Sequence, residues 1–366
     1  MGLEIDFLAV GDESRSGDAI ALRWGDLHGA RSNQWVAIID GGTRDAGKRL
    51  TEFIRSRYGT DTVDLVLSTH PDQDHVAGLH VVLDELKVGA LLIHRPWTAE
   101  HTNNIADLFK SGRVSDSSVR ERLRRSLNQA HELADVAQRK GITIAEPFAG
   151  CATPDGAFRI LGPTRALYED LLPYFRGTPE PKGSLFDTAQ HGIAKAAAAA
   201  LRWVEETFEI ETLDDKEDTS PENNSSAIAM LSVDGHSCLF TADAGKAALS
   251  GALDHLDASG FDYAGLRSVQ VPHHGSRRNV GPTILNRLLG SPQSSDAKSR
   301  SAFVSAAKKG TPKHPARKVC NAFRRRGAHV FATQGSSIWQ HFEAPERPDY
   351  STLEPLPFYD KVDEEA

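Results

Sequence analysis

The chain has 366 residues, enough for one large domain or two ordinary ones, and its hydrophobic and charged fractions are typical of a globular protein. Its N-terminus carries acids early, and no apolar run approaches the ~20 residues that span a bilayer, which argues against a signal peptide and a membrane protein. Three scattered cysteines, Cys151, Cys238 and Cys320, show no metal-type spacing and are expected to be thiols in a reducing compartment, which predicts a cytoplasmic protein.

Basic residues are concentrated in one segment. The net charge is −8, but residues 297–342 contain no Asp or Glu and hold ten of the 42 basic residues, so the rest of the chain has 32 against all 50 acids. This asymmetry predicts an anionic partner near the basic segment, and an ordinary solvated helix face accounts for a share of it.

The first 95 residues are expected to alternate strands and helices. LEIDFLAV, DAIALRW and QWVAIID read as strands separated by Gly, Ser and Asn, and a helix is expected at about 45–58. The next run, VDLVLSTH, is apolar on both faces and therefore predicts a buried central strand. A helix and the strand GALLIH are expected to follow it.

Residues 97–140 are expected to be mainly helical. The clearest helix runs from about Asp116 to Lys140, with Asp116 as its N-cap and Gly141 as its stop, because apolar residues recur there as a stripe. Strands are expected to resume at ITIAEPF and AFRILGP.

Residues 164–222 differ in composition and predict an inserted lobe. PYFRGTPEPKGS is rich in Pro and Gly, AKAAAAALRWVEETF is a good helix former, and residues 205–222 hold nine acids and one lysine. The last stretch predicts a mobile acidic loop.

From residue 223 strands and helices alternate again, beginning with a hairpin in SAIAMLSVDGHSCLFTAD. The main domain is therefore expected to be residues 1–342, interrupted by the helical stretch and the inserted lobe. Residues 343–366 are expected to form an acidic, extended tail.

The stretch HPDQDH, residues 70–75, places four potential metal ligands directly after the buried strand, where open sheets place ligands. On a tight loop, His70 and Asp72 can face one point while Asp74 and His75 face another. Imidazole and carboxylate together suit Zn²⁺ or Mn²⁺ rather than Ca²⁺. Two ions would need a shared carboxylate and further histidines.

Such residues follow later strands. Asp243 in LFTADAG comes just after one strand, and His273 and His274 in VPHHGS come just after the next. Each motif alone is a weak signal, but three such places in order along one chain predict a metal site.

These residues resemble the metallo-β-lactamase superfamily, whose first signature is His-x-His-x-Asp-His; here Asp72 stands at the second His position. That variant, with GDAIALRW, IIDGG, NNSSAIAML, LFTADAG, VPHHGS and TPKHPARKV…GAHVFATQGSS, resembles the ComEC-type branch, the hydrolase domain of competence-associated DNA-uptake proteins. The resemblance covers residues 3–95, 142–163 and 223–341. The membrane domain of those proteins is not in this sequence, so a role in DNA uptake does not follow.

The resemblance implies an α/β fold, an αββα sandwich with an inserted helical lobe, and a centre of two divalent ions, Zn or Mn, at one edge of the sheets. Asp243 would bridge the two ions, and His273 would support the centre or act as an acid. The metal ligands that it implies are His70, Asp72, Asp74, His75, Asp243 and His274.

One expected ligand is missing. Where the family has a further His before the paired strands, this chain reads ENNSSA and offers Asn223, Asn224 and Ser225. Asn223 is the expected substitute, and the first ion is expected to be loosely held. His94, at the end of GALLIH, is a rival ligand.

Together the resemblance and the basic residues imply a metal-dependent hydrolase, a phosphodiesterase or nuclease that cleaves DNA or RNA with a water activated by two ions. The catalytic residues implied are Asp74, His273 and His314, and one of the two histidines would protonate the departing oxygen. An ordinary packing role for His314 stays equally open. The residues expected to contact phosphate are Ser276, Arg277, Arg278, Lys308, Lys309 and Lys313.

Other interpretations stay open. The acidic loop 205–222 could cover the basic segment, in which case a regulatory protein, or a protease cutting in FRGTPEPKGS, would control the nuclease. A small-molecule phosphodiester, ester or lactone could be the substrate instead. The Asn in place of His also leaves room for a metal-binding scaffold without catalytic activity.

Overall fold

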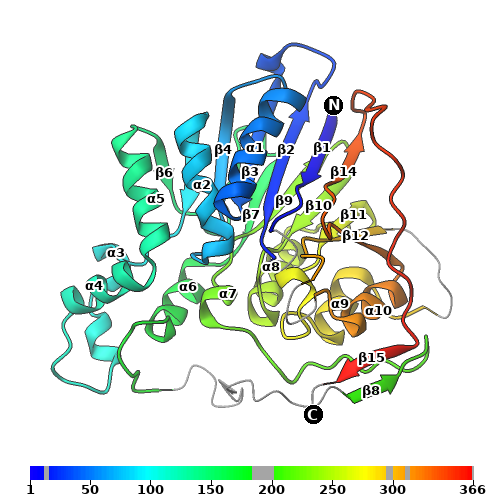
Figure 1. Cartoon of the computed structure of the whole chain (residues 1–366). Helices are drawn as coiled ribbons and strands as arrows, with labels where there is room; N and C mark the ends of the chain where they lie inside the picture. Colours follow the sequence, from blue (N-terminus) through cyan, green and yellow to red (C-terminus); the bar gives the residue numbers. More distant parts are fainter. Residues whose placement is uncertain (12–15, 184–201, 294–299, 310–313, 365–366) are drawn as a thin grey trace.

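Two β-sheets pack face to face and helices cover their outer faces, which gives four layers (Figure 1). The computed structural model describes residues 1–11, 16–183, 202–293, 300–309 and 314–364. The arrangement confirms the expected α/β class and αββα sandwich. No helix in the described ranges is long and apolar enough to cross a membrane.

The first sheet has the strand order β14-β1-β2-β3-β4-β5-β6. Strands β3 to β6 run parallel, so their carboxyl ends lie along one edge, and β14 returns from the far end of the chain to pair with β1. The strands are β1 (Gly2–Phe7), β2 (Ala19–Gly25), β3 (Gln34–Gly41), β4 (Thr62–Ser68), β5 (Lys87–Ile93), β6 (Thr143–Ala145) and β14 (Ile338–Phe342).

The second sheet has the order β13-β12-β11-β10-β9-β7. Strands β10 to β13 are parallel, and the expected Asp-Gly hairpin joins β9 to β10. The strands are β7 (Phe158–Gly162), β9 (Ile228–Val233), β10 (His236–Phe240), β11 (Leu266–Gln270), β12 (Arg300–Val304) and β13 (Ala328–Ala332).

Apolar residues fill three spaces between these layers. The inner one joins the two sheets and includes Leu22, Leu67, Phe240 and Phe303, all buried. The outer ones lie under helices, and burial of each large apolar side chain contributes roughly 1.5–3 kcal/mol. The helices on the first sheet are α1 (Arg44–Arg57), α2 (Gln73–Glu85) and α5 (Asn128–Arg139), and those on the second are α8 (Lys246–Ala258), α9 (Pro282–Leu289) and α10 (Arg317–Arg325).

Helix α2 lies unusually close to the end of β3. A Cβ atom on Gly78 would fall 1.9 Å from the carbonyl oxygen of Gly41, and the Gly78 amide donates to the Gly42 carbonyl at 2.8 Å. Glycine is therefore required at position 78 for this approach. The contact fixes the start of α2, which carries Asp74 and His75.

The long helix expected from Asp116 to Lys140 is two helices. Helix α4 (Asp116–Ser126) ends at Leu127, whose backbone leaves the helical region, and α5 then begins. The N-cap is Ser115, which forms a capping box with Ser118, so the predicted cap was one residue late. The break turns α5 back onto α2 and the first sheet.

The inserted lobe is only partly helical. Its described elements are α6 (Arg165–Leu171), the 3-10 turn η3 (Leu172–Tyr174), the strand β8 (Arg202–Glu205) and the short helix α7 (Pro221–Asn224). Most of the alanine-rich stretch lies outside the described residues, and its end is strand, not helix. β8 pairs with β15 (Lys361–Glu364), so the tail is tied to the lobe at its end.

The acidic segment that follows β8 is anchored on α10. Glu206 pairs with Arg325 at 3.2 Å, and both side chains are fully buried. Glu211 pairs with the buried Arg326 at 2.8 Å. Breaking a buried pair typically costs about 3–5 kcal/mol, so this end of the segment is held in place. The sequence predicted a mobile loop here.

Candidate metal centre

The HPDQDH stretch lies where the sequence predicted it, at the carboxyl end of β4. His70 follows the strand by two residues, Asp72 is the residue before α2, and Asp74 and His75 lie in its first turn. A strand end and a helix start therefore present the four side chains on one short turn.

The second sheet supplies the remaining residues from the same edge. Asp243 follows β10, and His273 and His274 follow β11. Ala242, His273 and His274 have positive φ values of 45°, 48° and 56°, which non-glycine residues rarely adopt. Such strained backbone often marks functional sites.

These side chains converge on one point, and we call His70, Asp72, Asp74, His75, Asp243, His273 and His274 the His/Asp centre. Asp243 lies in the middle: its Oδ2 is 3.6 Å from His70 Nε2 and 3.5 Å from His273 Nε2. Its Oδ1 is 3.4 Å from His75 Nε2. The two oxygens of Asp243 thus face two separate groups of ligands.

Each group contains another carboxylate. Asp72 Oδ2 lies 3.7 Å from His70 Nε2, and Asp74 Oδ2 lies 3.7 Å from His274 Nε2. The sequence paired His70 with Asp72 and Asp74 with His75, and the structure places Asp74 and His75 in a common group with His274.

The histidine rings are held from behind by their Nδ1 atoms. His75 Nδ1 contacts Asp40 Oδ2 at 2.7 Å, His274 Nδ1 contacts the Ser305 carbonyl at 2.8 Å, and His70 Nδ1 contacts Thr69 Oγ1 at 3.1 Å. Partners of this kind fix ring orientation in metal sites.

The Nε2 atoms that face inward have no such partner. In the described structure, Nε2 of His70, His75 and His274 and Oδ1 of Asp243 are buried and lack any hydrogen bond. Leaving buried polar atoms unpaired costs about 1–3 kcal/mol each. A shared set of unpaired imidazole and carboxylate donors fits divalent metal ions.

The electrostatics agree with this fit. Burial would raise the pKa of Asp243, but four histidines, with His273 first, hold it well below its ordinary value. Burial would lower the pKa of His75, but Asp243 and Asp40 hold it well above its ordinary value. His274 likewise has a pKa raised to about 9 by Asp243 and Asp74 against burial. The centre therefore favours positive charge.

The Asn223 side chain contacts Thr219 and His273. Its nitrogen donates to Thr219 Oγ1 at 2.7 Å and lies 3.2 Å from His273 Nδ1. Asn279 Nδ2 donates to the Asp243 carbonyl at 2.7 Å, so Asn279 Oδ1 accepts from His273 Nδ1 at 3.0 Å and leaves His273 Nε2 beside Asp243. Because a protonated Nδ1 cannot accept from an amide nitrogen, Asn279 rather than Asn223 orients the His273 ring.

Asp72 has a partner that the sequence did not predict. Its Oδ1 accepts a hydrogen bond from Arg176 Nη1 at 2.5 Å, and Arg176 comes from the inserted lobe, just after η3.

His314 lies beside the centre. Its ring centroid is 6.2 Å from that of His273 and 6.4 Å from that of His274, and its buried Nδ1 has no partner among the described residues. Burial, with some help from the two neighbouring histidines, lowers its pKa to about 4. In this state the ring is neutral at physiological pH.

His94 is elsewhere. It stacks on Tyr168 with centroids 4.3 Å apart and against Phe148 at 4.8 Å, and it belongs to none of the groups of potential metal ligands among the described residues. Burial lowers its pKa to about 3, so it packs as a neutral ring.

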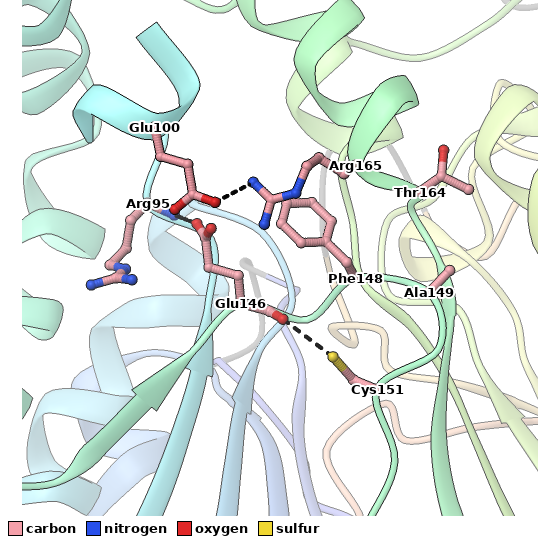
Figure 2. Close-up of a pocket in the computed structure, with 8 residues that line it drawn as sticks. All are labelled: Arg95, Glu100, Glu146, Phe148, Ala149, Cys151, Thr164 and Arg165. Carbon is pink, nitrogen blue, oxygen red and sulfur yellow. Dashed lines mark hydrogen bonds and ion pairs between the residues drawn. The ribbon is translucent and has the colours of Figure 1, made fainter. Parts of the chain in front are cut away.

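A pocket of about 510 Å³ lies near His94, and both of its carboxylates already have partners. Arg165 pairs with Glu100 at 2.8 Å, Glu146 accepts from the Arg95 amide at 2.7 Å, and the Arg95 side chain points away from the other lining residues (Figure 2). The pocket contains no residue of the His/Asp centre.

The arginines after the histidine pair already have acidic partners. Glu217 pairs with Arg278 Nε at 3.0 Å and lies 3.7 Å from Arg277 Nη2. Ser276 is buried, and its hydroxyl accepts from the Arg278 amide at 3.3 Å. Of the predicted phosphate contacts, these three therefore follow the centre directly, and the two arginines contact the acidic segment.

The predicted lysines divide differently. Lys308 and Lys309 are exposed on the loop after β12, three and four residues beyond the Ser305 carbonyl that holds His274. Lys313 lies outside the described residues.

Two aspartates of the centre's surroundings were missed. Asp40 contacts His75 and also accepts from the Thr69 hydroxyl at 2.6 Å, and Asp18 lies 3.7 Å from His75 Nδ1. Asp18 is buried, which raises its pKa, and accepts from Gln270 at 2.8 Å. Both belong to motifs quoted above, IIDGG and GDAIALRW. An acid at the end of a buried strand was the signal that could have found Asp40.

The model of the Metallo-beta-lactamase superfamily matches residues 31–288, most of the chain. A solved Thermotoga maritima protein described as a metallo-beta-lactamase is 10% identical, with a TM-score of 0.32 over 66% of this chain and 79% of that one. A diphosphatase from the PhnP family is 11% identical, with a TM-score of 0.38 over 93% of this chain and 98% of that one. No curated protein matches the sequence.

Proposed function

Because the chain belongs to the metallo-beta-lactamase superfamily, a family of metal-dependent hydrolases, we propose that it is a phosphodiesterase that cleaves DNA or RNA. The observation that carries this proposal is the His/Asp centre. In it, the inward Nε2 atoms of His70, His75 and His274 are buried and have no hydrogen-bond partner in the described structure. Basic residues beside the centre support a phosphate substrate. The motifs around Asp72 support placement in the ComEC-type branch.

The two faces of Asp243 support two ions, Zn²⁺ or Mn²⁺. The first would be held by His70, Asp72, Asp243 and His273, and the second by Asp74, His75, Asp243 and His274. In this assignment His273 is a ligand rather than an acid, and Asn279 orients it. Oxygen-rich ligand sets of this kind suit Mn²⁺ better than sets of histidines alone.

Bound divalent ions in such sites lower the pKa of water and neutralise charge on a phosphodiester. The chain's own residues hold and orient the histidine rings. Asp40, Thr69 and the Ser305 carbonyl fix the rings of His75, His70 and His274, so that each Nε2 faces inward.

His314 is then the residue left to donate a proton to the departing oxygen. Its ring lies beside His273 and His274, and its Nδ1 has no partner in the described structure. Because its pKa is lowered to about 4, the role requires that a bound phosphate raise that pKa.

Arg277 and Arg278 directly follow the centre, and Lys308 and Lys309 lie on the loop next to it. These residues can hold the phosphates on either side of the cleaved bond. The arginine forks suit phosphate oxygens particularly well.

The acidic segment is positioned to control access. Glu217, at the exposed end of the segment, contacts both Arg277 and Arg278. Its other end is fixed on α10, so a cut in FRGTPEPKGS would leave all these contacts in place. Displacement of Glu217 by an incoming polyanion fits the structure better than proteolytic release.

The test uses purified protein with Mn²⁺ or Zn²⁺ and four substrates: plasmid, single-stranded DNA, RNA and bis-p-nitrophenyl phosphate. We expect cleavage of a polymer and of the small ester. Asp74→Ala should lower both by more than about a hundredfold, since even a supporting group of a metal site is worth roughly 10–100-fold.

The control is Asp84→Ala, which removes an exposed acid from the same helix. It should leave activity unchanged. A wild-type protein that binds metal and hydrolyses none of the four substrates would overturn the proposal and favour a scaffold.

A second candidate substrate is a small phosphodiester. It is favoured by the pairing of Arg277 and Arg278 with Glu217, which leaves less cationic surface for a polymer than the sequence implied. Hydrolysis of the small ester alone would identify this case.

A further inference from the structure

The first metal position departs from the family pattern at two residues, and one departure is supported from the inserted lobe. Asp72 stands where the family signature has His, and the loop ENNSSA before the paired strands has no His. Arg176, from the lobe, contacts Asp72.

The geometry at Asp72 is directional. Arg176 takes Oδ1 at 2.5 Å, which leaves Oδ2 turned toward His70 Nε2 at 3.7 Å. Arg176 Nη2 also contacts the Pro71 carbonyl at 3.4 Å. A guanidinium with two contacts on one turn restricts the rotation of a carboxylate that is otherwise partly exposed.

Arg176 is itself fixed by the rest of the lobe. Its amide donates to Glu222 Oε1 at 2.5 Å, and its Nε donates to the Ser126 carbonyl at 3.4 Å. Glu222 immediately precedes Asn223 in α7. Contacts with Ser126, the last residue of α4, and with Glu222 of α7 therefore hold Arg176 against Asp72.

We propose that the inserted lobe completes the first metal site, with Arg176 as the positioning residue for Asp72. The inference rests on the metal centre of the proposed function. It assigns a role to a segment that contains none of the family motifs.

Two effects of Arg176 on the first ion oppose each other. Its positive charge disfavours a nearby cation, but solvent screens the charge of a side chain this exposed. Orienting a metal ligand is typically worth about 10–100-fold in affinity. Positioning should therefore win, and removal of Arg176 should weaken the first ion.

The experiment measures metal binding directly, without activity. Metal-free wild type, Arg176→Gln and Arg176→Lys are titrated with Mn²⁺ against a chromophoric chelator, and the spin coupling between neighbouring Mn²⁺ ions is followed by electron paramagnetic resonance. Wild type should bind two ions and show coupling. Arg176→Gln should bind one ion as before and the other roughly 10–100-fold more weakly. The signal of coupled ions should therefore be missing from this variant when Mn²⁺ is present in an excess of one equivalent.

Arg176→Lys keeps the charge without the fork and should fall between the two. The matched control is Arg122→Gln, an exposed arginine on α4, which should behave as wild type.

The outcomes separate the two claims. Two ions bound equally well by wild type and Arg176→Gln, or tighter binding in the variant, would overturn the role of the lobe and leave the proposed function intact. A wild type that binds no ion would overturn the proposed function itself.

Discussion

At the scale of single residues, the centre is organised by the two nitrogens of each imidazole. Nδ1 of His70, His75 and His274 is taken by an oxygen behind the ring, and Nε2 faces inward without a partner. This division fixes which nitrogen is available to a ligand. The oxygens behind the rings should therefore matter almost as much as the histidines themselves.

Asp40→Asn tests this at one position. The amide can still contact His75 but no longer carries the charge that favours the bound form, so metal affinity should fall roughly 10–100-fold. Chelator competition with Zn²⁺ or Mn²⁺ measures the effect, and Asp45→Asn, an exposed acid in α1, serves as the control. Equal affinity in Asp40→Asn and wild type would show that Asp40 does not support the site.

The sequence located the members of the centre through their type and their position after apolar strands. His70, Asp74, His75, Asp243 and His274 are brought together in this way. It missed the supporting residues, because a supporting role depends on which side chain lies behind a ring. Neighbours distant in sequence, such as Asp40 and Arg176, have no local pattern that reveals it.

At the scale of elements, the acidic segment has a fixed end and an exposed end. Glu206 and Arg325 anchor it with fully buried charges. Glu217 is about half exposed in its pairing with Arg278. Buried pairs resist disruption, whereas exposed pairs are weak, so only the exposed end can yield to a substrate.

Glu217→Gln should release Arg277 and Arg278 for phosphate. An exposed pair is worth about 0.2–1 kcal/mol, so the KM for an oligonucleotide should fall roughly twofold to fivefold with little change in kcat. The KM for bis-p-nitrophenyl phosphate, which has no flanking phosphates, should stay the same. Glu209→Gln, on the same segment, is the control. An unchanged KM for the oligonucleotide in Glu217→Gln would contradict control by this segment.

Helix α3 (Ala99–Thr102) is tied to the loop before β7 by His101, whose Nε2 contacts Glu146 at 2.8 Å. Burial alone would lower the pKa of His101, but Glu146 and Glu169 hold it above 6.5. A raised pKa means that charged His101 stabilises the fold below that value and that the benefit is lost as pH rises through the folded pKa. His101→Gln should therefore reduce the free energy of unfolding by about 2 kcal/mol near pH 6 and by less near pH 9. Urea unfolding at both pH values checks this; an equal loss at both would show that the charge is not involved.

Secondary structure was predictable where apolar patterns were long and bounded by turn residues, as in β4 and β11. The prediction was wrong where tertiary contacts decide which element forms. Leu127 breaks an apolar stripe that reads as one helix, and Arg202–Glu205 forms a strand because β15 is available to pair with it.

At the scale of the molecule, two sheets each contribute part of one centre. The first supplies His70 to His75 after β4, and the second supplies Asp243, His273 and His274 after β10 and β11. Neither sheet supplies both ligand groups, so the centre exists only when the sheets are packed together. Metal should accordingly bind the folded state and stabilise it.

The most direct test of the account is a metal titration of the chelated protein, followed by hydrolysis of bis-p-nitrophenyl phosphate and of an oligonucleotide. Activity should be absent without metal and should reach a plateau at two equivalents of Mn²⁺ or Zn²⁺, with a parallel rise in Tm. Asp243→Asn, which alters the carboxylate shared by both groups, should bind fewer ions and remain inactive. Hydrolysis that survives complete chelation, or a protein that binds two ions and cleaves neither substrate, would contradict it.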